Sequence, residues 1–180
     1  MIYSFSSLNS LDCAAFVSAL GHLFEHSPWV AEQTWAQRPF KDPAQLHAEL
    51  CRTMQSASVE KQMELIRAHP DLAGRLARQN QLTKESTREQ ASAGLDLLSD
   101  TERVDFQKLN DEYRSRFGFP FIICARLNAK DTIVNAMKSR LTNSAAAEKA
   151  AALVEIEKIA WLRLQDTLAG TNPHPGLAHE

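Results

Sequence analysis

Apolar residues recur along most of the chain at the spacing of amphipathic α-helices. Leu46, Leu50 and Met54 follow one another at four-residue intervals, which places them on one helix face. The segment after Ser144 is rich in alanine, the strongest helix former, and is expected to stay helical to about Leu168. Most of the predicted helices follow a residue suited to an N-cap. Their expected starts lie at or next to Ser10, Ser27, Asp42, Ser58, Ser86, Ser99, Asp131 and Ser144. The pattern therefore predicts an all-α fold, a helical bundle of about eight or more helices.

Two of these starts have the S-x-x-E pattern of a capping box. Ser86 and Glu89 predict an N-cap at Ser86 and a helix that follows it to Leu98. Ser99 and Glu102 predict the start of the next helix in the same way.

One short apolar run, from Phe119 to Cys124, has the character of a strand. Gly118 is placed to end the helix before it. Because the run is isolated, it predicts a buried extended segment and no sheet. A place in the core is the simplest interpretation. The backbone N–H and C=O groups of such a segment must still find partners, and a flat polar ligand is one candidate.

Composition and charge narrow the class of protein. The chain has 180 residues, 44% of them hydrophobic, which favours one globular domain over residues 1–170 with a flexible tail at 171–180. The net charge of −2 and the lack of clustered Lys and Arg argue against nucleic-acid binding. No apolar run reaches the length of a membrane span, and no secretory signal is present. Three widely separated cysteines, without a CxxC pair, favour reduced thiols in a cytoplasmic protein.

His69 is the first candidate for chemistry. The helix that starts at Ser58 should end near Ala68, because His69 precedes Pro70 and a residue before proline avoids the helical region. A histidine fixed beside a rigid proline can project into a cleft and exchange protons near neutral pH. The alternative is a partly buried histidine that only satisfies the end of the helix.

Ser86, Glu89 and Gln90 form a second candidate group. They serve either as a helix cap or as a ligand site, because a helix N-terminus presents free N–H groups and a positive dipole end. Glu89 could orient a histidine there or exchange a proton with a ligand.

Arg163 shares the apolar side of the last helix with Ile156 and Ile159. One interpretation is a packed stem with an exposed guanidinium. The other is a guanidinium that binds a substrate carboxylate with two hydrogen bonds.

Two other classes of function stay open at this point. His22, Glu25 and His26 form an H-x-x-E-H pattern, which a small zinc hydrolase would use as ligands and base. The pattern is short, and a helix C-terminus that attracts histidine explains it more simply. In a helical interaction module, the His69 and Ser86 motifs would be caps only.

Taken together, five stretches resemble the 2-oxo-4-hydroxy-4-carboxy-5-ureidoimidazoline (OHCU) decarboxylases. They run in order from near the N-terminus to the last helix, and together they are more specific than any one alone. The stretches are EHSPWVAE at 25–32, AHPDLA at 68–73, STREQASAGL at 86–95, LNDEY at 109–113 with FGFPF at 117–121, and IAWLRL at 159–164.

The resemblance implies an all-helical enzyme, commonly a homodimer, without a metal or an organic cofactor. It implies a substrate derived from 5-hydroxyisourate and (S)-allantoin as product. It places the catalytic histidine on His69 and the acidic partner on Glu89. It places substrate contacts on Pro70, Ser86, Thr87, Arg88, Gln90, Phe121, Ile122, Ile123, Cys124, Ala125 and Arg163. The missing peroxisomal ending agrees with a cytoplasmic protein, and the preceding hydrolase step is expected on another chain.

The resemblance also implies a mechanism. The substrate carries a carboxylate and a hydroxyl on one ring carbon, and the charge left by carbon dioxide delocalises into the adjacent carbon–nitrogen system. We expect His69, oriented by Glu89, to carry the protons. Arg163 and the backbone of residues 121–125 are expected to hold the substrate.

Overall fold

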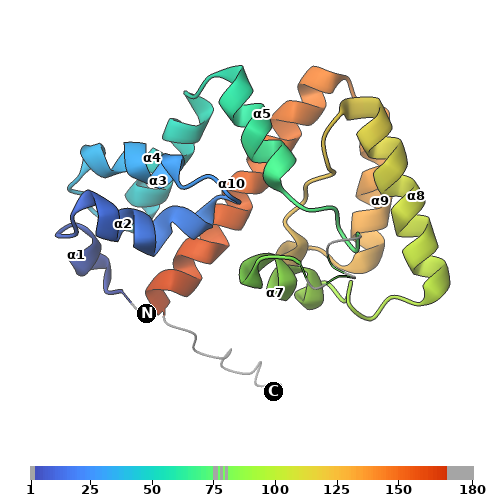
Figure 1. Ribbon diagram of the computed structural model, residues 1–180, viewed down its shortest axis with the longest axis horizontal. Helices are drawn as coiled ribbons and strands as arrows, with labels where there is room; N and C mark the ends of the chain where they lie inside the picture. Colours follow the sequence, from blue (N-terminus) through green and yellow to red (C-terminus); the bar gives the residue numbers. More distant parts are fainter. Residues whose placement is uncertain (1–2, 75–76, 78, 80, 170–180) are drawn as a thin grey trace, which may run out of the picture. The chain divides into compact units, whose positions relative to one another are not determined.

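The computed structural model describes residues 3–74, 77, 79 and 81–169, and all regular secondary structure in these residues is helical (Figure 1). The all-α prediction is therefore confirmed. The chain divides into two compact units, residues 1–56 with 160–180 and residues 57–159. The extent of a domain over residues 1–170 stays a prediction, and the expected tail at 171–180 lies outside the described residues.

The first unit contains short helices packed around apolar side chains. Phe16, Leu20, Val30, Leu46 and Leu50 are almost fully buried in it. Its elements are α1 (Phe5–Leu8), α2 (Cys13–Leu20), the 3-10 turn η1 (Gly21–Leu23), α3 (Trp29–Thr34), η2 (Trp35–Gln37), α4 (Pro43–Gln55) and the last residues of α10 (Ala145–Ala169).

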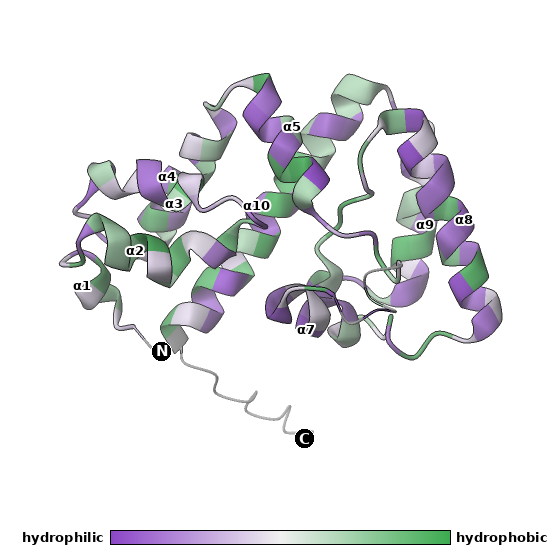
Figure 2. Cartoon of the chain, viewed as in Figure 1, coloured by the Kyte–Doolittle hydropathy of each residue, from purple (hydrophilic) through white to green (hydrophobic). Residues whose placement is uncertain are grey.

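The second unit contains the helices that carry most of the predicted site residues. Its elements are α5 (Val59–Ala68), α7 (Lys84–Ser92), α8 (Asp100–Phe117), η3 (Ala125–Leu127), α9 (Lys130–Arg140) and the first part of α10. Helices α8 and α9 pack side by side (Figure 1). Helix α8 carries both polar and apolar residues along its length (Figure 2). Its buried side includes Phe106, Asn110 and Tyr113.

Several helix ends lie where the sequence places them. The side chain of Asp42 accepts from the backbone N–H of Gln45 at the start of α4. Ser99 and Glu102 form the expected capping box at the start of α8. Gly118 ends that helix in the left-handed region, with φ of 75°, which glycine adopts without the steric penalty of a side chain.

The first predicted helix begins at a different residue. Its cap is Asp12, whose carboxylate accepts from the backbone N–H of Ala15 at 2.8 Å, and not Ser10. The α-helix stops at Leu20 and continues only as the 3-10 turn η1. A separate short helix, α1, precedes it and is capped by Ser4. Ser10 and Asp12 are both suitable N-caps by residue type, and the structure uses Asp12.

Residues 119–125 are all buried and belong to no helix up to Cys124, as the sequence predicts. Cys124 has the extended backbone angles φ −70° and ψ 93°. None of the described helices combines the length and the apolar character that a membrane span requires.

Candidate active site

His69 lies at the end of α5, where the helix stops at Ala68. Its backbone is extended, with φ −71° and ψ 140°, as the following proline demands. The side chain is 7% exposed, and its Nδ1 lies 2.9 Å from the carbonyl oxygen of Leu65. Because a carbonyl only accepts, Nδ1 carries the proton in this contact. The neutral ring then has its basic lone pair on Nε2, the nitrogen able to take up a proton.

The turn that follows His69 is held by side chains from two helices. Gln90 on α7 accepts from the backbone N–H of Ala73 at 2.9 Å, and its amide donates to the carbonyl of Asp71. Asn110 on α8 donates to the carbonyl of Leu72 at 2.9 Å. Ala73 itself has φ of 51°, a conformation rare for residues other than glycine. Gln90 therefore fixes the geometry of the residues next to Pro70, while its expected substrate contact stays a prediction.

The capping box predicted at Ser86 is wrong. Helix α7 begins three residues earlier, because Thr83 is the N-cap and accepts from the backbone N–H of Ser86 at 3.2 Å. The helix also stops at Ser92 and not at Leu98, and Gly94 follows with φ of 73°. Thr83 and Ser86 are both suitable N-caps by residue type. The S-x-x-E pattern indicated Ser86, but the structure uses Thr83.

The shifted start changes where the α7 candidates lie. Ser86 is buried in the first turn of α7, and Glu89 is partly exposed one turn later. Thr87 and Arg88 are exposed. Helix α7 packs against η3, which begins at Ala125. The helix that carries Glu89 thus lies against the end of the extended segment.

The extended segment receives polar partners from α9 and α10. Arg140 donates from Nη1 to the carbonyl of Ile122 at 2.8 Å. The carboxylate of Glu155 accepts from the backbone N–H of Cys124 at 2.8 Å. The Cys124 carbonyl accepts from Asn128 at 2.9 Å. Part of this backbone is therefore satisfied within the protein.

Arg140 is itself part of a buried polar network. Glu148, which has no exposed surface, pairs with the guanidinium of Arg140 and accepts from the amide of Asn143 at 2.8 Å. Tyr113 donates its hydroxyl to the same carboxylate. Burial and the neighbouring carboxylate raise the pKa of Tyr113 well above its ordinary value, so the phenol stays protonated.

The thiol of Cys124 lies in an environment that disfavours its ionisation. Burial, followed by the negative charges of Glu155 and Glu89, raises the pKa of Cys124 from 9.0 to about 11. A thiolate nucleophile at this position is therefore disfavoured. All three cysteines are free thiols, as expected.

Arg163 belongs to the first unit, and its guanidinium is buried there. Nη1 donates to Glu25 at 3.0 Å and to the carbonyl of His22 at 3.1 Å. Arg163 is 3% exposed, so the interpretation with an exposed guanidinium is wrong. Its role in substrate binding stays a prediction.

The same contacts weigh against the zinc-hydrolase alternative. Helix α2 ends at Leu20, so His22, Glu25 and His26 do not share a helix face. The Glu25 carboxylate pairs with Arg163, and His26 is exposed with φ of 48°. Across the described ranges, no three His, Cys, Asp or Glu side chains gather as they would around a metal ion.

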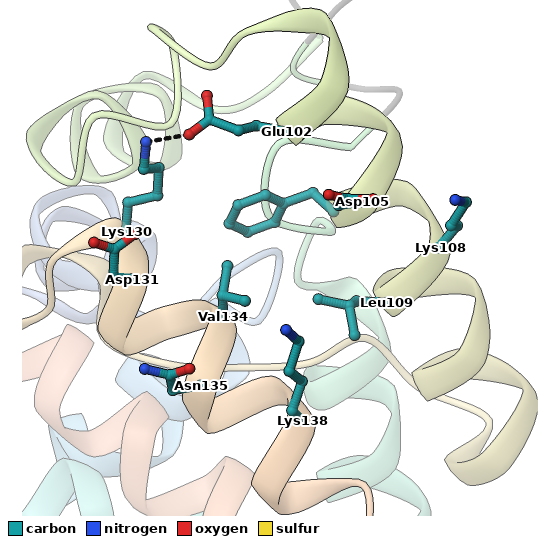
Figure 3. A pocket seen from close by; sticks show the side chains of 10 residues that line it. Glu102, Asp105, Lys108, Leu109, Lys130, Asp131, Val134, Asn135 and Lys138 are labelled. Atoms are coloured by element: carbon teal, nitrogen blue, oxygen red, sulfur yellow. Dashed lines mark hydrogen bonds and ion pairs between the residues drawn. The ribbon is translucent and has the colours of Figure 1, made fainter.

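An open cavity of about 610 Å³ lies between α8 and α9 (Figure 3). Phe106, Leu109 and Val134 form its apolar part, and Glu102 pairs with Lys130 at one side. None of the candidate residues lines this cavity, so it is separate from the candidate site.

Sequence reasoning missed four polar residues that shape the site. Asn110 holds the turn after His69, Arg140 and Glu155 hold the extended segment, and Glu148 fixes Arg140. A glutamate in an alanine-rich helix gives no local sign of burial. Only their long-range partners distinguish these residues from solvated polar residues on the surface. A single sequence does not reveal those partners.

The arrangement suits acid–base chemistry on a polar ligand. His69 offers an imidazole whose Nδ1 is held by the Leu65 carbonyl, and α7, the helix that carries Glu89, packs against the end of a segment rich in peptide groups.

Comparisons with known proteins agree with one family. A family model described as OHCU decarboxylase matches residues 9–165. A 2-oxo-4-hydroxy-4-carboxy-5-ureidoimidazoline decarboxylase from Halalkalicoccus jeotgali is 46% identical over 159 residues, which cover 88% of this chain and 88% of that protein. A protein of the same name from Haloferax volcanii is 45% identical over 159 residues, or 88% and 92% of the two chains.

The fold has a solved counterpart as well. The crystal structure of an (S)-allantoin synthase matches with a TM-score of 0.72 at 30% identity. The match covers 92% of this chain and 53% of the solved one, so this chain spans about half the length of that relative.

Proposed function

Because this chain belongs to the OHCU decarboxylase family, we propose that it decarboxylates 2-oxo-4-hydroxy-4-carboxy-5-ureidoimidazoline to (S)-allantoin in urate degradation. The match over residues 9–165 is the observation that carries this proposal. The burial and orientation of His69 at the end of α5 support it.

The proposed reaction breaks the bond between the ring carbon and its carboxylate. The electron pair forms a double bond to the neighbouring ring carbon, the π electrons of the adjacent carbon–nitrogen double bond move onto the nitrogen, which takes up a proton from solvent, and carbon dioxide leaves. The hydroxyl on the same carbon gives up its proton and becomes a carbonyl. The neighbouring carbon accepts a proton on one face, which sets the S configuration. The delocalised charge needs no external electron sink, so we propose that the enzyme acts without a cofactor.

His69 is the proposed proton carrier. Its Nδ1–H is held by the Leu65 carbonyl, so Nε2 is the atom that takes and returns protons. A positioned acid–base group contributes about 10²- to 10⁴-fold to the rate. Glu89 is the proposed acidic partner, and the turn held by Gln90 fixes the residues next to the histidine.

The remaining assignments rest on the family. We propose that Ser86, Thr87, Arg88 and Gln90 contact the substrate from α7, and that the backbone of residues 121–125 binds its amides. Arg163 is proposed to bind the substrate carboxylate, for which its bidentate guanidinium is suited. A homodimer in the cytoplasm is proposed on the same basis.

The test is to generate the substrate in place from urate with urate oxidase and 5-hydroxyisourate hydrolase. The spontaneous decay gives racemic allantoin, which has no lasting circular dichroism. We expect the wild-type protein to produce a persistent (S)-allantoin signal. Folded protein that leaves the trace at background would refute the proposed function.

A further inference from the structure

Two side chains satisfy one edge of the extended segment. Arg140 donates to the Ile122 carbonyl, and Glu155 accepts from the Cys124 N–H, each at 2.8 Å. In an extended chain, the peptide groups of alternate residues point to the same edge. The Ile122 carbonyl and the Cys124 N–H therefore share one edge, and two side chains occupy the places that a neighbouring strand would take.

The other edge carries the peptide groups of Phe121 and Ile123. Within the part of the chain that the structure describes, neither the N–H nor the C=O of Ile123 has a hydrogen-bond partner. Ile123 is 8% exposed. A buried peptide group that lacks a hydrogen-bond partner destabilises the protein, so this edge favours a ligand that offers both an acceptor and a donor. A urea or amide group has that pattern.

Both anchors are themselves fixed in place. The guanidinium of Arg140 pairs with the fully buried Glu148 and lies over the ring of Phe121 at 4.4 Å. Glu155 pairs with Lys158 at 2.6 Å, one turn further along α10. Glu148 and Glu155 are seven residues apart, so they lie on one face of α10 about two turns apart.

We infer that Arg140 and Glu155 are positioning residues, which hold one edge of residues 122–124 so that Ile123 presents its peptide groups to a urea or amide ligand. This inference rests on the proposed function, in which the ligand is the ureido substrate. Neither side chain takes part in proton transfer. Each acts through the backbone that it holds.

Glu155 offers a matched set of variants. Glu155→Ala removes the acceptor for the Cys124 N–H. Glu155→Gln keeps an oxygen acceptor and loses only the charge. Lys158→Ala removes the exposed ion pair of Glu155 but leaves the Cys124 contact intact.

We expect Glu155→Ala to lower kcat/KM about tenfold, which corresponds to about 1.4 kcal/mol, mainly through a higher KM, because the segment loses a hydrogen bond to a charged group. Glu155→Gln and Lys158→Ala should stay within about twofold of wild type, in line with the small effect of exposed ion pairs. The pH profile should keep its shape in all three, because His69 is not altered. Binding of (S)-allantoin, measured by calorimetry, should weaken in parallel with KM.

Amide exchange at Cys124, followed by NMR, tests the contact without turnover. Exchange should be faster in Glu155→Ala and unchanged in Lys158→Ala. Wild-type KM in a folded Glu155→Ala protein, or a Glu155→Gln variant as impaired as Glu155→Ala, overturns the inference. If wild type neither turns over the substrate nor binds (S)-allantoin, the proposed function fails. The anchoring of the segment is then judged by the exchange of the Cys124 amide alone.

Discussion

Glu148 shows how one buried carboxylate organises its surroundings. It has no exposed surface and binds Arg140, Asn143 and the hydroxyl of Tyr113. Burying an ion costs several kcal/mol of desolvation. The attraction to its partners offsets this cost only when its hydrogen bonds are complete. The network therefore secures the position of Arg140 more than it adds to net stability.

We expect Glu148→Ala to destabilise the fold by about 3–5 kcal/mol, because it leaves the guanidinium of Arg140 buried without its counter-charge. Tyr113→Phe is the matched control, since it removes one hydrogen bond and keeps the ion pair. It should lower the free energy of unfolding by about 1 kcal/mol. Urea unfolding of both variants measures the difference. Equal effects of the two substitutions would contradict this view of the network.

Cys124 makes stability depend on pH in the alkaline range. Its pKa is raised from 9.0 to about 11, so the folded protein retains the thiol proton more tightly than the unfolded chain. The resulting stabilisation is complete below about pH 9 and is lost as the pH rises toward 11. We expect wild type to lose up to about 1.4 kcal/mol more per pH unit than Cys124→Ala over this range. If the curves of unfolding free energy against pH run parallel for wild type and Cys124→Ala, folding does not raise the pKa of this thiol.

At the scale of single elements, capping decides where the helices begin. Asp42, Ser58 and Ser99 cap the helices that the sequence assigns to them. At α7 the sequence offers two caps three residues apart, and the structure uses Thr83. Local patterns predict that a helix exists, whereas the choice between neighbouring caps depends on the packing of the whole helix.

The position of the α7 cap leads to a prediction. Thr83→Ala should lower the stability by about 1 kcal/mol, because the Ser86 N–H loses its acceptor. Thr83→Ser keeps a hydroxyl and should restore most of that loss. Thermal unfolding followed by far-UV circular dichroism compares the three proteins. If Thr83→Ala melts at the wild-type temperature, Thr83 does not cap the helix.

The site was predictable from the sequence only in part. His69 beside Pro70 has a local signature, since the proline ends the helix and the histidine follows directly from it. Arg140 and Glu155 have none, because their partners at Ile122 and Cys124 lie 18 and 31 residues away along the chain. A sequence shows which side chains can carry charge, and the fold determines which of them hold a backbone group.

At the scale of the whole molecule, the proposed chemistry needs no metal. We expect activity to survive dialysis against a chelator, followed by assay in metal-free buffer, within about twofold of untreated protein. The zinc-hydrolase alternative predicts loss of activity and its return with zinc. Metal analysis of protein purified without a histidine tag provides the control. Activity that falls on chelation and recovers with a metal would refute the cofactor-free mechanism.

We propose above all that this chain is a stereospecific decarboxylase that depends on His69. The most direct measurement follows the circular dichroism of substrate generated in place, with wild-type protein and with His69→Asn in parallel. The variant must first show wild-type far-UV circular dichroism. We expect a rapid and persistent (S)-allantoin signal with wild type, and a trace indistinguishable from spontaneous decay with His69→Asn. A near-normal rate from the variant would contradict the role of His69, and a racemic product from wild type would contradict the proposed function itself.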